Sequence, residues 1–232
     1  MESNVCSIRV AAREGPSTVV MTPKVSCDSS GRMLDTAGML RIVFVCLGNR
    51  CRSPMAEGFV RDFAKGLPVE VGSVGLLDAG PVGAPREVLE IMEGWGVDLS
   101  SHRARALASV DLSGADLVIG FERTHLAASV VDAGVPHERA FTLAEIVRLL
   151  EAIEPPASTD PIERARLAVA RAHGYRDVAG FVANEDIADP FGGHRRRYVD
   201  VAARTRDLSR RLLAGLFGPI ALAGTSHGER RV

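Results

Sequence analysis

The chain has 232 residues, of which 46% are hydrophobic, and a formal net charge of −1. This length and composition suit one globular domain with appendages and exclude a disordered or strongly polyionic chain. Because 29 acidic residues offset 28 basic ones, the charge balance argues against a nucleic-acid binder. The sequence has no run of about 18 apolar residues and no secretory signal pattern, so we expect a cytoplasmic protein without a membrane span.

The first 38 residues mix serine, threonine, glycine and charged side chains without helical or strand periodicity. We predict that residues 1–38 form a flexible extension before the folded domain, residues 39–218. Within that domain apolar strands alternate with amphipathic helices. The expected strands are residues 42–45, 69–74, 115–120 and 139–142, and the expected helices are residues 54–65, 84–95, 122–133 and 143–152. This order predicts a three-layer α/β/α, Rossmann-like fold with a four-stranded parallel sheet.

The pattern then changes toward the C-terminus. Residues 154–183 are predicted to be a helical insertion, in which Pro161 begins a helix over 161–174. A long amphipathic helix over 194–216 follows, and we expect it to pack on the sheet. Residues 219–232 are predicted to be a C-terminal tail.

The connection between the first strand and the first helix carries the candidate chemistry. Cys46 ends the apolar strand and is followed by Gly48, Arg52, Ser53 and Pro54. At the carboxyl end of a parallel strand, a tight loop and a helix N-terminus offer converging N–H groups and positive potential, which predicts a phosphate-binding loop. The same field favours a thiolate at Cys46, and Gly48 is expected to permit the awkward backbone turn.

Arg52 lies six positions after Cys46, a spacing that lets a curled loop return the guanidinium to an anion held over the sulfur. Its planar fork can bind two phosphate oxygens at once, a geometry that lysine does not offer. Ser53 lies at the start of the helix. Its hydroxyl is expected to cap the helix or to hydrogen-bond the sulfur.

Simpler interpretations of this loop stay open from the residues alone. A lone cysteine at a strand end is usually a small core residue, and a cysteine and an arginine at this spacing also arise by chance. A zinc site is not expected, because Cys46 and Cys51 have no second pair of cysteines or histidines at ligand spacing. The four cysteines also do not form a disulfide framework.

Residues 46–57 closely resemble the signature loop of the low-molecular-weight protein tyrosine phosphatases. The likeness continues at Ser73, in residues 96–107 and in residues 186–193. It therefore extends over residues 40–216, with residues 154–183 longer than the minimal form of the family.

The resemblance implies hydrolysis of phosphotyrosine in a protein or peptide, without a metal or cofactor. Cys46 would attack phosphorus and form a cysteinyl phosphate, while Arg52 clamps the phosphate. Asp189 would protonate the leaving phenolate and then act as base on the hydrolytic water.

The resemblance also implies roles for the surrounding residues. Phosphate contacts are expected from Leu47, Gly48, Asn49, Arg50, Cys51, Arg52 and Ser53. A supporting hydrogen-bond network is expected from Asn49, Ser53, Ser73 and His102. Leu47 and Phe191 are expected to flank the phenyl ring of the substrate. Cys51 either forms a reversible disulfide with Cys46 that prevents over-oxidation or is a passive small residue.

Two departures from the family pattern affect these expectations. Arg50 stands where the family usually has an apolar residue or, in arginine-phosphate-specific members, threonine. Its charge at the rim favours acidic phosphopeptides and weakens the case for an arginine phosphatase. Residues 121–125 replace the usual Met-Asp-x-x-Asn, so the details of that supporting loop are not predicted.

Two rival functions accompany the phosphatase hypothesis. Related enzymes reduce arsenate with the same loop, but no cysteine follows Cys51, so only a version coupled to a low-molecular-weight thiol is compatible with the sequence. A non-catalytic phosphate-binding module is the second rival, although binding alone needs neither the nucleophile nor Asp189. The sequence does not predict an oligomeric state.

Overall fold

The computed structural model describes residues 38–180, 182, 183 and 185–218. The strands are β1 (Leu40–Cys46), β2 (Val69–Gly75), β3 (Leu117–Gly120) and β4 (Ala140–Thr142). The α-helices are α1 (Arg52–Phe63), α2 (Arg86–Gly94), α3 (Arg123–Val131), α4 (Leu143–Ala152), α5 (Pro161–Ala179) and α6 (Arg195–Phe217). Two short 3-10 helices are η2 (Leu107–Ser109) and η3 (His137–Arg139).

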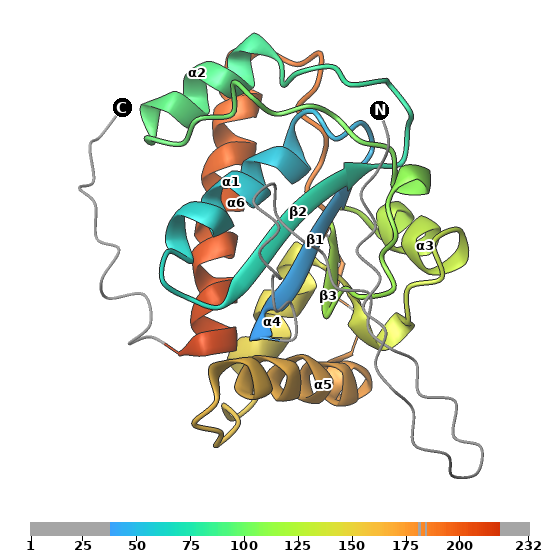
Figure 1. Cartoon of the computed structure of the whole chain (residues 1–232), viewed down its shortest axis with the longest axis vertical. Helices are drawn as coiled ribbons and strands as arrows, with labels where there is room; N and C mark the ends of the chain where they lie inside the picture. Colours follow the sequence, from blue (N-terminus) through green and yellow to red (C-terminus); the bar gives the residue numbers. More distant parts are fainter. Residues whose placement is uncertain (1–37, 181, 184, 219–232) are drawn as a thin grey trace, which may run out of the picture. The chain divides into compact units, whose positions relative to one another are not determined.

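The four strands form one parallel sheet in the order β2-β1-β3-β4. Figure 1 shows β2, β1 and β3 side by side in this sheet. β1 takes a central position because its apolar side chains are buried on both faces, as in parallel sheets generally. Leu40 pairs with Val69 and Cys46 pairs with Gly75, so β1 and β2 end together at one edge of the sheet. The predicted α/β fold with a four-stranded parallel sheet is confirmed.

A hydrophobic core lies on each face of the sheet. On one face Ile42 and Phe44 of β1 pack in a large cluster with apolar side chains of α1, α2, α4, α5 and α6. On the other face Val45 belongs to a smaller cluster that includes Val74 and Val118, with side chains of α3 packed against it. Successive residues of β1 therefore serve opposite cores, which holds the end of the strand firmly on both sides.

The structure differs from the predicted boundaries by one or two residues at most element ends and by five at the end of α5. α1 begins at Arg52, two residues before Pro54, because a proline in the first turn removes an N–H that needs no helical partner. β3 begins at Leu117 instead of residue 115. α5 continues to Ala179, five residues beyond the predicted end, and stops at Gly180, whose φ is 67°.

Some predictions fall on residues that the structure does not describe. The N-terminal extension lies outside the described residues except for residue 38, and the C-terminal tail lies wholly outside them. The division into extension, domain with insertion, and tail therefore stays a prediction. Over the described ranges, no helix combines the length and the apolar character needed to cross a membrane.

Candidate active site

The loop between β1 and α1 is held in an unusual backbone conformation. The left-handed residue is Asn49, with φ of 50°, and not Gly48, where the sequence predicted the awkward turn. Asparagine tolerates this region better than most residues with a side chain. Gly75, at the end of β2, lets the loop approach: a Cβ there would lie 2.7 Å from the Asn49 nitrogen and 2.8 Å from the Gly48 carbonyl carbon.

Asn49 is the centre of a buried hydrogen-bond network that fixes this conformation. Its side-chain nitrogen donates to the hydroxyls of Ser53 at 2.9 Å and Ser73 at 2.8 Å. Its side-chain oxygen accepts from the backbone N–H of Arg105 at 2.9 Å. Nε2 of His102 lies 2.7 Å from the Asn49 carbonyl, which can only accept. The structure thus brings together the four residues named for the supporting network.

The network continues to Glu57, to which the sequence assigned no role. The Ser73 hydroxyl donates to the Glu57 carboxylate, which also pairs with Arg61 on the next turn of α1. Glu57 lies four residues after Ser53, so both side chains share one helix face. This four-residue spacing is the feature of the sequence from which the position of Glu57 could have been predicted.

Cys46 is buried, with 2% of its surface exposed. Its sulfur lies 3.0 Å from the Ser53 hydroxyl. Asn49 donates to that hydroxyl oxygen, so the hydroxyl proton points either at the sulfur or at the Val74 carbonyl, which lies farther away at 3.4 Å. A donor directed at sulfur stabilises negative charge on it.

Arg52 is almost fully buried and holds three acceptors. One terminal nitrogen donates to the Glu122 carboxylate and to the Ile187 carbonyl, the latter at 2.8 Å. The other donates to the Asp189 carboxylate at 2.8 Å. Its buried Nε has no hydrogen-bond partner among the described residues, so this N–H and the second N–H of the nitrogen that faces Asp189 remain as donors for an anionic ligand.

Glu122 was missed as a functional residue by sequence reasoning. It lies in the segment 121–125 that departs from the family pattern, and no role was predicted for its side chain. In the structure its carboxylate accepts a hydrogen bond from one terminal nitrogen of Arg52 and so orients the guanidinium. A carboxylate on a buried arginine also offsets the cost of burying that charge.

Cys46, Asp189 and Phe191 meet at one small cavity of about 180 Å³. Its other lining residues are Leu47, Gly48, Arg50, Cys51, Leu77 and Ala79. Leu47 and Phe191 are exposed at its mouth, as is Leu77, which sequence reasoning did not identify. Asp189 also accepts from the backbone N–H of Phe191 at 3.1 Å, so the two residues are fixed together.

Cys51, the second cysteine of the loop, has the properties of an unreactive, protonated thiol. It is buried and free, and burial above all, followed by the charges of Asp189 and Cys46, raises its pKa to about 12. The thiol is therefore protonated near neutral pH. Whether Cys51 pairs with Cys46 on oxidation stays a prediction.

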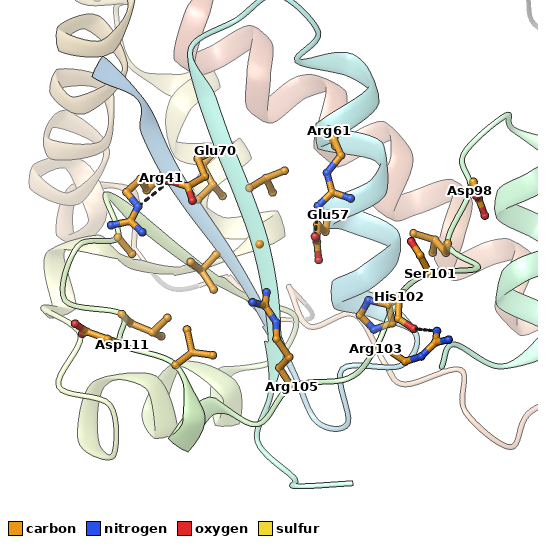
Figure 2. A pocket seen from close by; sticks show the side chains of 18 residues that line it. Arg41, Glu57, Arg61, Glu70, Asp98, Ser101, His102, Arg103, Arg105 and Asp111 are labelled. Atoms are coloured by element: carbon orange, nitrogen blue, oxygen red, sulfur yellow. Dashed lines mark hydrogen bonds and ion pairs between the residues drawn. The ribbon is translucent and has the colours of Figure 1, made fainter. Parts of the chain in front are cut away.

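A larger hollow of about 490 Å³ lies along β2, the edge strand, behind this network (Figure 2). Two ion pairs occupy its walls: Arg41 with Glu70 at 3.0 Å, and Arg61 with Glu57. It shares His102 with the loop network but contains no cysteine among its lining residues. The candidate active site is therefore the smaller cavity at Cys46.

His125 is a buried histidine next to the arginine clamp. Its Nδ1 accepts from the backbone N–H groups of Phe121 at 3.2 Å and Glu122 at 3.0 Å. Burial first, and the nearby charge of Arg52 second, lower its pKa from 6.5 to about 4. A second proton on Nδ1 would face these two donors, so the folded state keeps the ring neutral.

This depressed pKa predicts a loss of stability in acid. Between about pH 6.5 and about pH 4 the unfolded chain binds a proton at residue 125 that the folded chain does not, so the free energy of unfolding falls by roughly 2–3 kcal/mol. Urea unfolding of wild type and His125→Asn at about pH 7 and about pH 4.5 measures this difference. The variant should lose less stability than wild type, and His194→Asn, at an exposed position, should behave as wild type. Equal losses in wild type and His125→Asn would contradict the assignment.

A protein-family model described as low molecular weight phosphotyrosine protein phosphatase matches residues 41–160. The probable low molecular weight protein-tyrosine-phosphatase EpsP of Ralstonia nicotianae is 40% identical over 78 residues, which are 34% of this chain and 52% of EpsP. The chain thus spans about half the length of this relative. The protein-arginine-phosphatase of Bacillus subtilis is 30% identical over 178 residues, covering 75% of this chain and 93% of that protein.

A solved structure of the low molecular weight protein tyrosine phosphatase from T. tengcongensis superposes with a TM-score of 0.56 and 29% sequence identity. The match covers 75% of this chain and 97% of that one. The range of the family match contains the loop from Cys46 to Arg52 and ends before Asp189.

Proposed function

This chain belongs to the low molecular weight phosphotyrosine protein phosphatase family, and we propose that it hydrolyses phosphotyrosine in proteins or peptides through a phosphocysteine intermediate. The strongest support for this proposal is that Cys46 and Asp189 line one small cavity, and that the buried guanidinium of Arg52 is paired with Asp189 at 2.8 Å. A nucleophile, an anion clamp and an acid are the three groups that two-step phosphate ester hydrolysis needs.

In the first step the Cys46 thiolate attacks phosphorus. A phosphorus–sulfur bond forms, the bond from phosphorus to the tyrosine oxygen breaks, and the leaving oxygen takes a proton from Asp189. The carboxylate of Asp189 is paired with Arg52. A bound phosphate competes for that arginine, and a carboxyl group released from Arg52 is free to carry the proton to the leaving group.

In the second step Asp189, now ionised, takes a proton from a water molecule. The water oxygen attacks phosphorus, the phosphorus–sulfur bond breaks, and Cys46 leaves as a thiolate while inorganic phosphate forms. The Ser53 hydroxyl, 3.0 Å from the sulfur, stabilises the departing thiolate. Asp189 is thereby returned to its protonated form.

Positive potential for the transferring phosphoryl group comes from the chain itself. Arg52 supplies a guanidinium whose position is set by Glu122, and the loop adds backbone N–H groups at the N-terminus of α1. The proposed mechanism therefore includes no metal ion or cofactor. The proposed compartment is the cytoplasm, where cysteine thiols stay reduced.

The cavity walls favour an aromatic ester over a phosphoarginine. Leu47 and Phe191 offer apolar surface to a phenyl ring. Arg50, which also lines the cavity, would repel the cationic guanidinium that phosphoarginine regenerates on hydrolysis. The similarity to a protein-arginine-phosphatase makes phosphoarginine the second substrate to test.

The direct test is phosphate release from matched phosphotyrosyl, phosphoseryl and phosphoarginyl peptides in the presence of a chelator. We expect turnover of the phosphotyrosyl peptide well above that of the other two. Preference for the phosphoarginyl peptide would contradict the substrate assignment. No turnover of any peptide would contradict the hydrolase and favour arsenate reduction with a low-molecular-weight thiol, or phosphate binding alone.

Asp189→Asn should reveal the general acid through its dependence on the leaving group. With a phosphotyrosyl peptide, kcat is expected to fall by about 10³-fold, because the phenolate must leave without a proton. With p-nitrophenyl phosphate, whose leaving group is stable as an anion, formation of the phosphocysteine should change much less. Stopped-flow release of p-nitrophenolate measures that first step, and an equal loss for both substrates would contradict the role.

A further inference from the structure

Three arginines, one of which lines the cavity while two contact the loops that contribute lining residues, have no carboxylate partner among the described residues. They are Arg50, Arg103 and Arg197, here called the basic rim. Most other arginines of the described part form ion pairs, including the neighbours Arg195 and Arg196 on α6. An arginine without a carboxylate partner beside an anion site adds to its positive potential. One terminal nitrogen of Arg103 donates to the Ser100 and His102 carbonyls, and its charge is not offset by these neutral acceptors.

Contacts connect the members of the basic rim to the catalytic loops. Nε of Arg50 donates to the Gly83 carbonyl at 3.2 Å, and a terminal nitrogen of Arg103 lies 3.9 Å from where a Cβ of Gly83 would be. On the other side Arg197 packs on Gly193, with its Cδ 3.0 Å from the corresponding position. Gly193 follows Asp189 by four residues. The basic rim therefore includes residues that contact the loop between β2 and α2, at Gly83, and a residue in the first turn of α6, Arg197.

Arg50 is held in place without using its terminal nitrogens. Its guanidinium carbon lies 5.1 Å from the centre of the Phe191 ring, and Gly83 accepts its Nε. None of its four terminal N–H groups has a partner among the residues that the structure describes. A guanidinium fixed by stacking and by one hydrogen bond loses little freedom when it binds a carboxylate.

Carboxylates near the mouth do not cancel this charge. Asp189 is already paired with Arg52. Asp78, which follows Leu77 at the cavity, accepts a hydrogen bond from the Gly80 backbone and contacts none of the three arginines within ion-pair distance. The free charge at the mouth is therefore cationic.

We propose that the basic rim recognises acidic side chains next to the phosphotyrosine, so that the substrate class is acidic phosphotyrosyl peptides. This inference rests on the proposed function, because the phosphate must enter the cavity at Cys46. Arg50, the rim arginine that lines the cavity, binds the carboxylate nearest to the phosphotyrosine. Arg197 and Arg103 attract carboxylates farther along the peptide.

The test uses the full chain and two phosphotyrosyl peptides that differ only in glutamate or glutamine at the flanking positions. Two exposed ion pairs of ordinary strength predict a kcat/KM about five-fold higher for the glutamate peptide, a ratio that falls toward one in about 0.5 M salt. A ratio of one in wild type at low salt would overturn the inference, and this arm needs no variant.

Variants assign the preference to the rim. In Arg50→Gln and in Arg197→Gln the glutamate-to-glutamine ratio should fall toward one, whereas Arg50→Lys should keep part of it because the charge remains. Arg196→Gln is the matched control. It removes the same charge from the residue next to Arg197, and the side chain of Arg196 faces Asp200 and is not part of the rim. A ratio that falls equally in Arg196→Gln would overturn the assignment to the rim.

Phenyl phosphate separates failure of this inference from failure of the proposed function. It has no flanking residues, so wild type should hydrolyse it whatever the rim recognises. Turnover of phenyl phosphate with equal use of both peptides overturns the inference and leaves the function intact. No turnover of phenyl phosphate or of either peptide overturns the proposed function, and the inference with it.

Discussion

Replacement of Cys46 by serine is expected to lower kcat by about 10⁵-fold or more, as loss of a catalytic nucleophile does in other hydrolases. The serine hydroxyl is a weak nucleophile without a base beside it, and the group nearest the sulfur, Ser53, is itself a hydroxyl. The variant should remain folded, because the substitution is nearly isosteric. Steady-state assays with p-nitrophenyl phosphate measure kcat, and thermal unfolding shows whether the variant is folded.

Cys51→Ser is the matched control for this variant. Cys51 lies in the same loop and is equally buried, but its raised pKa keeps it a neutral thiol. Its replacement should cost orders of magnitude less activity than that of Cys46. If Cys51→Ser were the more damaging change, or if Cys46→Ser kept a tenth of wild-type kcat, Cys46 would not be the nucleophile.

Arg52→Lys is expected to lower kcat/KM by about 10³-fold. A lysine has one charged nitrogen and cannot reach the Glu122 carboxylate, the Ile187 carbonyl and a phosphate in the geometry of the planar fork. Inorganic phosphate should also bind more weakly, which titration calorimetry or competitive inhibition measures.

Arg166→Lys is the control for the change of side chain alone. Arg166 pairs with Asp116 at 2.9 Å on the surface, away from the cavity residues, and its replacement should leave kcat/KM unchanged. Arg52→Lys also loses packing in the core, so its free energy of unfolding should be compared with that of wild type. A folded Arg52→Lys protein with more than a tenth of wild-type kcat/KM would contradict the role of phosphate clamp.

Much of the fold followed from the sequence because strands and helices differ in their apolar period. β1 is a continuous apolar run ending at Cys46, and such a run predicts a strand buried on both faces. The family resemblance in the loop after it is confirmed by the family match. The end of α5 was wrong by five residues, because its residues are polar on most sides and only Gly180 marks the stop.

The parts of the site that sequence reasoning missed depend on contacts between distant segments. Glu122 and Ile187 reach Arg52 across separations of 70 and 135 residues. No spacing within one element predicts such pairs, since only the sheet brings their loops to the same edge. Likewise, the strain fell on Asn49 and not on Gly48 because Ser53, Ser73 and Arg105 all bind the Asn49 side chain.

The proposed mechanism requires that Cys46 becomes covalently phosphorylated during turnover. The most direct measurement mixes Asp189→Asn with p-nitrophenyl phosphate, quenches the reaction within one turnover and maps the phosphate by peptide mass spectrometry. In this variant p-nitrophenolate can still leave, because it needs no acid, but the second step is slow because the water has lost the base Asp189. The phosphocysteine should therefore accumulate, and the phosphate should be found on Cys46. Phosphate on another residue, or product release with no phosphorylated enzyme at any time, would contradict the phosphocysteine mechanism.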